Sequence, residues 1–261
     1  MSRFCTLFSG STGNCTYIGA SGGGILIDAG VSAKRIEKAL LEREIDLTTI
    51  KAIFVTHEHT DHIKGLRVFA SRAKIPVFAS DKTVEAMLLR NDVGESIDLR
   101  VFEDSVSVAG MEISRFDTSH DCEGSSGFIV KTPDGRKMAV CTDLGYVSDT
   151  VRQSLLGCDL VLLESNHDIM MLQNGPYPYI IKQRILSDSG HLSNVACAAE
   201  LCGLVRSGTT RIVLGHLSRE NNHPELARTT ARASLIDGGF KEDIDYILYV
   251  AKPSGNKVLV L

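Results

Sequence analysis

The segment HEHTDH, residues 57–62, concentrates metal-binding side chains within one turn of chain. Imidazole and carboxylate groups together suit zinc, manganese or iron. Side chains two residues apart on an extended segment point the same way, so His57 and His59 should face one ion. Asp61 and His62 fall at the start of a predicted helix and should face another direction. The segment therefore predicts ligands for two adjacent metal ions, and the alternative interpretation is a solvated polar turn.

Four further candidates stand at or just after the ends of predicted strands, where a loop can present a side chain: Asp28, His120, Asp143 and His216. The carboxylate of Asp143 can bridge two cations roughly 3.5–4 Å apart, or it can be a turn residue before Gly145. Asp28 can orient a ligand histidine from behind, or it can cap a turn. His120 and His216 are either metal ligands or core histidines with satisfied hydrogen bonds.

Taken in order, Asp28, the HEHTDH segment, His120, Asp143 and His216 resemble the five motifs of the metallo-β-lactamase superfamily over almost the whole chain. The resemblance implies an α/β fold, a four-layer αβ/βα sandwich forming a single domain over residues 1–261. It also implies two divalent metal ions per chain (zinc, manganese or iron). The implied ligands are His57, His59 and His120 for the first metal, Asp61, His62 and His216 for the second, and Asp143 as the bridge. Asp28 takes the place of the residue that orients a ligand.

His191 distinguishes branches of this superfamily. It lies in the run 189–194, which leads into a predicted Ala-rich helix, and Ser193 and Asn194 stand at the start of that helix. Free N–H groups and the positive dipole end of a helix favour a phosphate. The run is similar to the histidine motif of tRNase Z-type and other phosphodiesterase members, where the histidine faces the scissile phosphate. The alternative is an ordinary helix cap with a solvated histidine.

Two more segments refine the resemblance. The loop 9–14, which ends in Asn14, and the run 164–168 around His167 look like the YycJ/WalJ group, bacterial metallohydrolases described as DNA 5′-to-3′ exonucleases. The loop is either a hairpin turn or a wall of the site. Candidate substrate contacts are Asn14, His167, Ser193 and Asn194, and the role of His167 stays open. The large domain that RNase J-type enzymes insert before the last histidine is absent, which favours DNA ends as the substrate.

The resemblance implies a hydrolase in which hydroxide held between two metals attacks phosphorus. Asp61 would orient the hydroxide and His191 would assist the departing oxygen, so both are candidate catalytic residues. We expect a DNA 5′-to-3′ exonuclease. The alternatives are a hydrolase of the same fold acting on a small or cyclic phosphodiester, a thioester or a lactam, a redox protein resembling flavo-di-iron enzymes, and a non-catalytic metal-binding regulatory protein.

Composition limits how such a protein attracts a nucleic acid. The chain of 261 residues has a net charge of −4, so it has no broad basic surface, and phosphate must be attracted by bound metal or a local patch. A candidate cationic track is Arg115, Lys182, Arg184, Arg219, Arg228 and Arg232. The 7 cysteines form no C-x-x-C pair, which predicts reduced, mostly buried thiols. No apolar run reaches the roughly 18–20 residues of a membrane span, and we expect a cytoplasmic protein of undetermined oligomeric state.

The elements that must position these residues follow from hydrophobic patterning. The pattern predicts strands at 4–8, 16–19, 24–28, 51–56 and 76–79, a helix after Ser32, a helix from the HEHTDH segment to about residue 71 and a helix at 81–90. The middle, 97–142, reads as strands. The last part predicts strands at 160–164, 211–215, 246–251 and 257–261, with helices at 148–156, near 168, 180 and 194, and from 224. These predict two sheets bracketed by helices.

Overall fold

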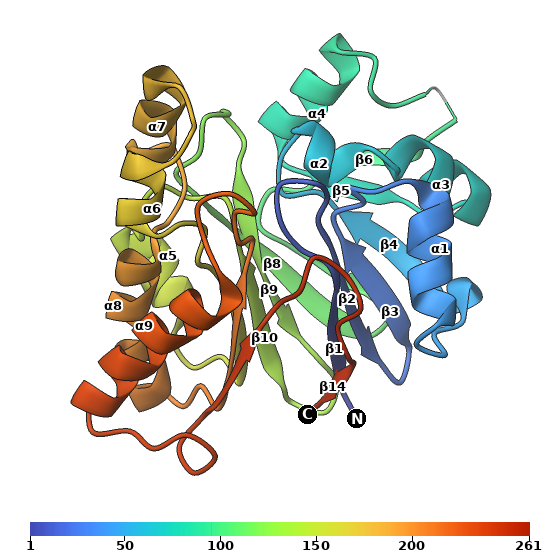
Figure 1. The fold of residues 1–261 in the computed structure, drawn as a ribbon. Helices are drawn as coiled ribbons and strands as arrows, with labels where there is room; N and C mark the ends of the chain where they lie inside the picture. The colour runs from blue at the N-terminus through green and yellow to red at the C-terminus, as the bar shows by residue number, and fades with distance from the viewer. Residues whose placement is uncertain (95) are drawn as a thin grey trace.

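Two seven-stranded sheets face each other between two layers of helices in the computed structural model, which describes residues 1–94 and 96–261 (Figure 1). The first sheet has the order β14-β1-β2-β3-β4-β5-β6 and the second β13-β12-β11-β10-β9-β8-β7. The first sheet comprises β1 (Arg3–Phe8), β2 (Cys15–Ala20), β3 (Gly23–Ile27), β4 (Ile50–Phe54), β5 (Val77–Ala79), β6 (Leu99–Val101) and β14 (Leu259–Val260). The second comprises β7 (Ser105–Val108), β8 (Met111–Asp117), β9 (Ser126–Lys131), β10 (Lys137–Cys141), β11 (Leu160–Glu164), β12 (Arg211–Gly215) and β13 (Ile247–Val250).

Helices cover the outer face of each sheet. On the side of the first sheet lie α1 (Ala33–Leu41), the 3-10 helix η1 (Leu47–Thr49), α2 (Thr60–Ile63), α3 (Leu66–Ala73) and α4 (Asp81–Leu89). On the side of the second lie α5 (Asp149–Leu155), α6 (Ile169–Asn174), α7 (Tyr179–Leu186), α8 (Asn194–Arg206) and α9 (Pro224–Asp237). Buried apolar residues form one cluster between the sheets and one between each sheet and its helices. The predicted four-layer αβ/βα sandwich is confirmed.

Parallel pairing determines where the polar residues at strand ends gather. Strands β3 to β6 pair in parallel in the first sheet, and β10 to β13 do so in the second. The carboxyl ends of parallel strands meet at one edge of a sheet, so the loops after β3, β4, β10 and β12 collect at one end of the sandwich. The two chain termini lie at the opposite end, where β1 pairs with β14 (Figure 1).

The helix predicted to run on from the HEHTDH segment is two helices, α2 and α3, with Gly65 between them. The Gly65 N–H donates to the Ala29 carbonyl at 2.8 Å, and a Cβ at Gly65 would lie 2.0 Å from the Val31 carbonyl oxygen. This close approach of the loop after β3 separates the two helices. The remaining predicted elements agree with the structure to within a few residues.

All seven cysteines are free thiols, and five of them are buried, as the sequence predicts. Among the residues described, no helix combines the length and apolar character that crossing a bilayer requires.

The inner core contains a cluster of phenylalanines around Phe54 of β4. Its ring is fully buried and lies 5.1 Å from that of Phe78, 5.6 Å from Phe102 and 5.7 Å from Phe128, centroid to centroid. Phe128 belongs to the second sheet, so the cluster joins the two sheets.

Replacing Phe54 by Ala should lower the free energy of unfolding by about 3–5 kcal/mol, because apolar burial is lost and a cavity remains. Urea denaturation followed by circular dichroism measures the change. The matched control is Leu88→Ala on α4, where the side chain is 60% exposed and a change within about 0.5 kcal/mol is expected. Equal effects of the two substitutions would contradict the inner position of Phe54.

Candidate metal centre

Three histidines from two loops meet on one side of the site. His59 is the residue before α2, and its side chain does not cap the helix, which leaves the imidazole free to face the site. His57 Nε2 lies 3.1 Å from His59 Nδ1, and the His57 and His120 rings lie 4.9 Å apart. Ligand atoms of these three residues all lie within 4.8 Å of one another. The structure thus brings together the three residues expected to hold a first metal.

The second expected group also converges. Asp61 Oδ2 lies 3.6 Å from His62 Nε2 and 3.8 Å from His216 Nε2. Asp143 lies between the two groups, with Oδ2 at 3.3 Å from His62 Nε2 and Oδ1 at 3.9 Å from His120 Nε2. Its carboxylate is therefore in reach of both sets of imidazoles.

Three residues that come just after strands adopt left-handed backbone conformations where the chain turns into the cluster. Asp28 after β3 has φ 63°, Asp143 after β10 has φ 62°, and His216 after β12 has φ 53°. Such conformations cost of order 1–3 kcal/mol each and persist where surrounding contacts fix them. The Asp28 N–H donates to the Phe54 carbonyl and the His216 N–H donates to Ser9 Oγ, each at 2.8 Å. Backbone strain of this kind clusters at functional sites.

Hydrogen bonds behind the imidazoles fix their orientation. His62 Nδ1 donates to Asp28 Oδ2 at 2.7 Å, and Asp28 Oδ1 accepts from the Thr56 N–H at 2.8 Å. His120 Nδ1 lies 3.1 Å from the Gly190 carbonyl oxygen and donates to it. In each case the other nitrogen, Nε2, faces the cluster. This arrangement, with one ring nitrogen held and the other presented, is typical of histidines that ligate metals.

Glu164, the last residue of β11, fixes the orientation of two imidazoles through hydrogen bonds to their Nδ1 atoms. Its Oε1 accepts from His216 Nδ1 at 2.8 Å and from His191 Nδ1 at 2.9 Å, and its Oε2 accepts from the N–H groups of Leu144 and Leu192. Burial alone raises the pKa of a carboxyl, but these histidines lower the pKa of Glu164 to about 2. The fully buried carboxylate is therefore ionised and joins His191 to the cluster.

The sequence prediction missed Glu164, although a carboxylate closing the apolar strand LVLLE was a signal for it. It also missed Asp121, which directly follows His120. Asp121 Oδ1 lies 3.3 Å from His120 Nε2 and 3.5 Å from His59 Nε2. Both residues add negative charge next to the imidazoles.

The donor atoms fit divalent metal ions. Within residues 1–94 and 96–261, His120 Nε2, His216 Nε2 and Asp143 Oδ2 are buried and have no hydrogen-bond partner. Unpaired buried polar atoms are rare and need an explanation. A set of imidazole nitrogens and carboxylate oxygens suits zinc, manganese or iron, and a metal would satisfy all three atoms.

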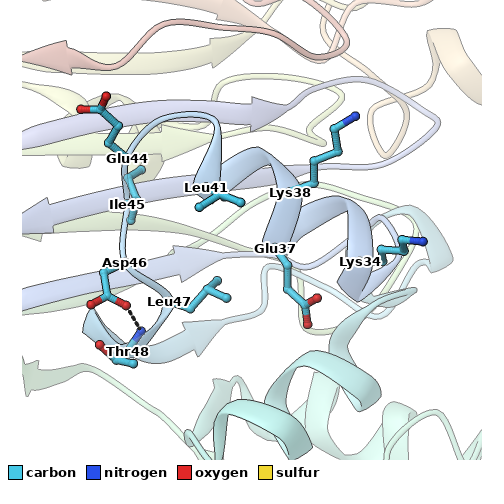
Figure 2. A pocket seen from close by; sticks show the side chains of 9 residues that line it. All are labelled: Lys34, Glu37, Lys38, Leu41, Glu44, Ile45, Asp46, Leu47 and Thr48. Atoms are coloured by element: carbon cyan, nitrogen blue, oxygen red, sulfur yellow. Dashed lines mark hydrogen bonds between the residues drawn. The ribbon is translucent and has the colours of Figure 1, made fainter.

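The cluster opens into a cavity of about 300 Å³, whose polar lining includes His59, Asp61, Asp143, His191 and His216. A larger cavity of about 870 Å³ lies between α1 and η1 (Figure 2). Figure 2 shows its apolar side chains, Leu41, Ile45 and Leu47, together with charged side chains that also line it. It contains no histidine or cysteine, so the smaller cavity is the one suited to metal-dependent chemistry.

The four residues predicted to contact substrate differ in where they lie relative to the histidine cluster and the cavity. Asn14 lies at the cluster, with Nδ2 at 3.0 Å from His62 Nε2 and 3.3 Å from Asp61 Oδ2. Ser193 Oγ accepts from the Ala196 N–H as the cap of α8. Asn194 is buried and bonded to Ser165 and Asn222. Neither Ser193 nor Asn194 is among the residues that line the cavity.

His167 is buried beside the site without lining the cavity, and neither of its ring nitrogens has a hydrogen-bond partner among the described residues. Burial lowers its pKa to about 4, so the imidazole is neutral at pH 7. His191 differs, because the Glu164 carboxylate outweighs the effect of burial and raises the pKa of this imidazole.

Of the six residues in the candidate cationic track, Arg184 lines the cavity, where its guanidinium pairs with Asp121. Arg115 pairs with Asp117, and Arg228 and Arg232 both pair with Glu242. Of the six residues in the predicted track, Arg184 is therefore the one that lines the cavity within the part of the chain that the structure describes.

Glu164→Gln should lower the free energy of unfolding by about 1–3 kcal/mol, because an amide NH₂ would face N–H donors that now share a carboxylate. Urea denaturation measures this, with Glu112→Gln, whose side chain is 56% exposed, as the control. An unchanged midpoint for Glu164→Gln would show that the carboxylate does not hold these histidines.

Sequence comparison matches a domain family and several relatives, two of which are described here. The β-lactamase superfamily domain matches residues 24–217. The chain is 40% identical to exodeoxyribonuclease YycJ of Bacillus anthracis over 91% of this chain and 90% of the relative. It is 36% identical to exodeoxyribonuclease WalJ of Streptococcus pneumoniae over 96% of this chain and 94% of the relative.

Comparison of structures agrees on the fold. The metallo-β-lactamase fold protein YhfI of Bacillus subtilis superposes with a TM-score of 0.72 over 99% of this chain and 98% of that chain, at 15% sequence identity. The match to the superfamily domain and the alignment with these relatives over most of their length confirm the resemblance expected from the motifs: this chain belongs to the β-lactamase superfamily and has the metallo-β-lactamase fold.

Proposed function

We propose that this protein is a metal-dependent nuclease that hydrolyses phosphodiester bonds at DNA ends, in the 5′-to-3′ direction. The observation that carries the proposal is the convergence of the two histidine groups on Asp143, beside a cavity that His191 also lines. The relatives named exodeoxyribonuclease, which align over most of this chain, support DNA as the substrate.

The proposed centre would hold two divalent ions. His57, His59 and His120 would hold one ion, Asp61, His62 and His216 would hold the other, and Asp143 would serve both. Supporting this, the ligand atoms of each group of three lie within 4.8 Å of one another, and Asp143 also groups with His57 and His62. Asp28 orients His62 through its hydrogen bond of 2.7 Å.

When bound, such ions supply positive charge for the phosphate and lower the pKa of the attacking water. The Asp61 carboxylate lines the cavity, where it can accept a hydrogen bond from that water and orient it toward phosphorus. Asn14 Nδ2 donates to Asp61 and helps to fix the carboxylate. Asp61 and Asn14 would therefore align the attacking water with phosphorus.

His191 is proposed to act on the departing oxygen. Its Nδ1 proton is held by Glu164, which leaves Nε2 as the nitrogen that can donate a hydrogen bond to a substrate in the cavity. Groups placed where negative charge develops stabilise the transition state, and losing one costs about 10²–10³ in rate. His191 thus complements the charge supplied at the metal centre.

The substrate assignment is tested with end-labelled single- and double-stranded DNA and RNA, incubated with protein loaded with zinc, manganese or iron. We expect mononucleotide release from the 5′ end of DNA. Release from the 3′ end would contradict the polarity, and cleavage of RNA alone would contradict the substrate. Failure of the metal-loaded protein to cleave any of these, or bis-p-nitrophenyl phosphate, would contradict the proposed activity.

Asp143→Asn should lose bound metal and nuclease activity, because an amide neither carries the charge nor bridges two cations as a carboxylate does. Elemental analysis after dialysis gives metal per chain, and the labelled DNA assay gives the rate. Asp117→Asn, which changes a carboxylate with 80% side-chain exposure on β8, should leave both unchanged. Full metal content in Asp143→Asn would remove this residue from the proposed ligands.

His191→Ala should retain metal and lose about 10²-fold or more of the cleavage rate. The exposed His223, which caps α9 without a side-chain hydrogen bond, provides the control His223→Ala. Cleavage at the full rate by His191→Ala would show that His191 does not act on the departing oxygen.

A further inference from the structure

One cation in the cavity has no part in the mechanism proposed above. Of the cavity-lining residues in the described part of the chain, Arg184 is the one whose side chain is always positively charged. It stands in the last turn of α7, and it shares the cavity with Asp61, Asp143 and His191. A guanidinium placed among the groups that are proposed to act at phosphorus needs an explanation.

Asp121 holds the guanidinium by one edge. Arg184 Nε and Nη2 both pair with Asp121 Oδ2. The other oxygen of this carboxylate, Oδ1, lies 3.5 Å from His59 Nε2 and 3.3 Å from His120 Nε2. Asp121 therefore fixes the position of the guanidinium relative to the first histidine group.

The end of α7 is also joined to the segment that carries His191. The Ile185 carbonyl accepts from the His191 N–H at 3.0 Å. A Cβ at Gly190 would lie 2.3 Å from the Arg184 carbonyl oxygen, so the two segments are in close contact. The guanidinium and the imidazole proposed to face the departing oxygen are therefore supplied by segments that are packed together.

The other edge of the guanidinium is available to a ligand. Arg184 Nη1 forms no hydrogen bond within the described residues. The side chain is 49% exposed, and an ion pair this exposed contributes little to stability. A guanidinium is planar and always charged, and its paired N–H groups match the oxygens of a phosphate. These features favour a phosphate contact over a purely structural ion pair.

We propose that Arg184 is a further catalytic residue, whose guanidinium donates hydrogen bonds to a non-bridging oxygen of the scissile phosphate. This rests on the hydrolase function proposed above. During hydrolysis the oxygen of a water molecule bonds to phosphorus, the bond from phosphorus to the departing oxygen breaks, and the departing oxygen gains a proton. The phosphoryl oxygens carry negative charge in the transition state, which Arg184 stabilises without giving up a proton.

The test uses two substrates, DNA and bis-p-nitrophenyl phosphate, because the second contains the scissile phosphate and no other. The values of kcat and KM are measured for metal-loaded wild type, Arg184→Ala and Arg184→Lys, and metal per chain and the urea midpoint are determined for each. The matched control is Arg136→Ala, since Arg136 is 46% exposed and pairs with Asp159. Arg136 directly precedes β10, whereas Asp143 of the site follows the other end of that strand.

Arg184→Ala should lose about 10²-fold in kcat on both substrates, the loss typical of removing one donor to an oxygen that is charged in the transition state. Arg184→Lys should fall between this variant and wild type, because an ammonium keeps the charge without the planar donors. Metal content and urea midpoint should stay near wild type, as should all values for Arg136→Ala. Guanidinium ion below its denaturing concentration should restore part of the rate to Arg184→Ala, which a distorted site would not show.

Wild-type kcat for Arg184→Ala on both substrates overturns the inference. A loss confined to DNA also overturns it, since Arg184 would then bind a phosphate other than the scissile one. A loss of metal or a lowered urea midpoint in Arg184→Ala overturns it as well, because the residue would then act on the centre or on the fold. In these cases the hydrolase function stands. If the metal-loaded wild type cleaves neither substrate, the proposed function fails and the inference fails with it.

Discussion

The imidazoles of His57, His62, His120 and His216 are buried next to the carboxylate of Asp143, at the point where two sheets end. Taking polar groups out of water costs about 1–3 kcal/mol for each one left without a partner. The convergence is therefore unfavourable by itself and becomes favourable when cations satisfy it. The remaining features of this end of the sandwich are arranged around that requirement.

Carboxylates behind the histidines provide the first of these features. Asp28 and Glu164 each end or follow a buried strand, accept backbone N–H groups, and hold the Nδ1 protons of ligand candidates. The strands fix the carboxylates, the carboxylates fix the rings, and the rings present Nε2. Because Glu164 holds both His216 and His191, it places the proposed contact to the leaving oxygen at a set position relative to the centre.

The close packing of three segments around the site is the second feature of this end of the sandwich. Gly30 has no room for a side chain, since a Cβ there would lie 1.6 Å from the Asp61 carbonyl oxygen. Asn14 donates its N–H to that same oxygen and accepts from the Gly30 N–H, each at 2.8 Å. The loop before β2, the turn after β3 and helix α2 are thus joined by the backbone. A small cavity between rigid loops is suited to catalysis, which depends on positions held to fractions of an ångström.

Much of this was predictable from the sequence because parallel strands bring their carboxyl ends together. Apolar runs ending in Asp28, Asp143 and His216 indicated the strands and the expected donors, and the spacing in the HEHTDH segment indicated two directions. Glu164 was missed because its role depends on long-range partners, His191 and His216, whose positions no local pattern specifies. The break at Gly65 was missed for the same reason, since it results from contact with the loop after β3. Ser193 and Asn194 were named from a helix-start pattern, and only tertiary packing shows that their side chains are engaged with the Ala196 N–H and Asn222.

We propose that these loops form a centre for two metal ions. A crystal structure of the manganese-loaded protein, with anomalous diffraction collected above and below the manganese absorption edge, tests it most directly. Two anomalous peaks are expected: one among His57, His59 and His120, and one among Asp61, His62 and His216, with Asp143 contacting both. A metal-loaded crystal with no peak between these residues, or with its metal elsewhere on the protein, would contradict it.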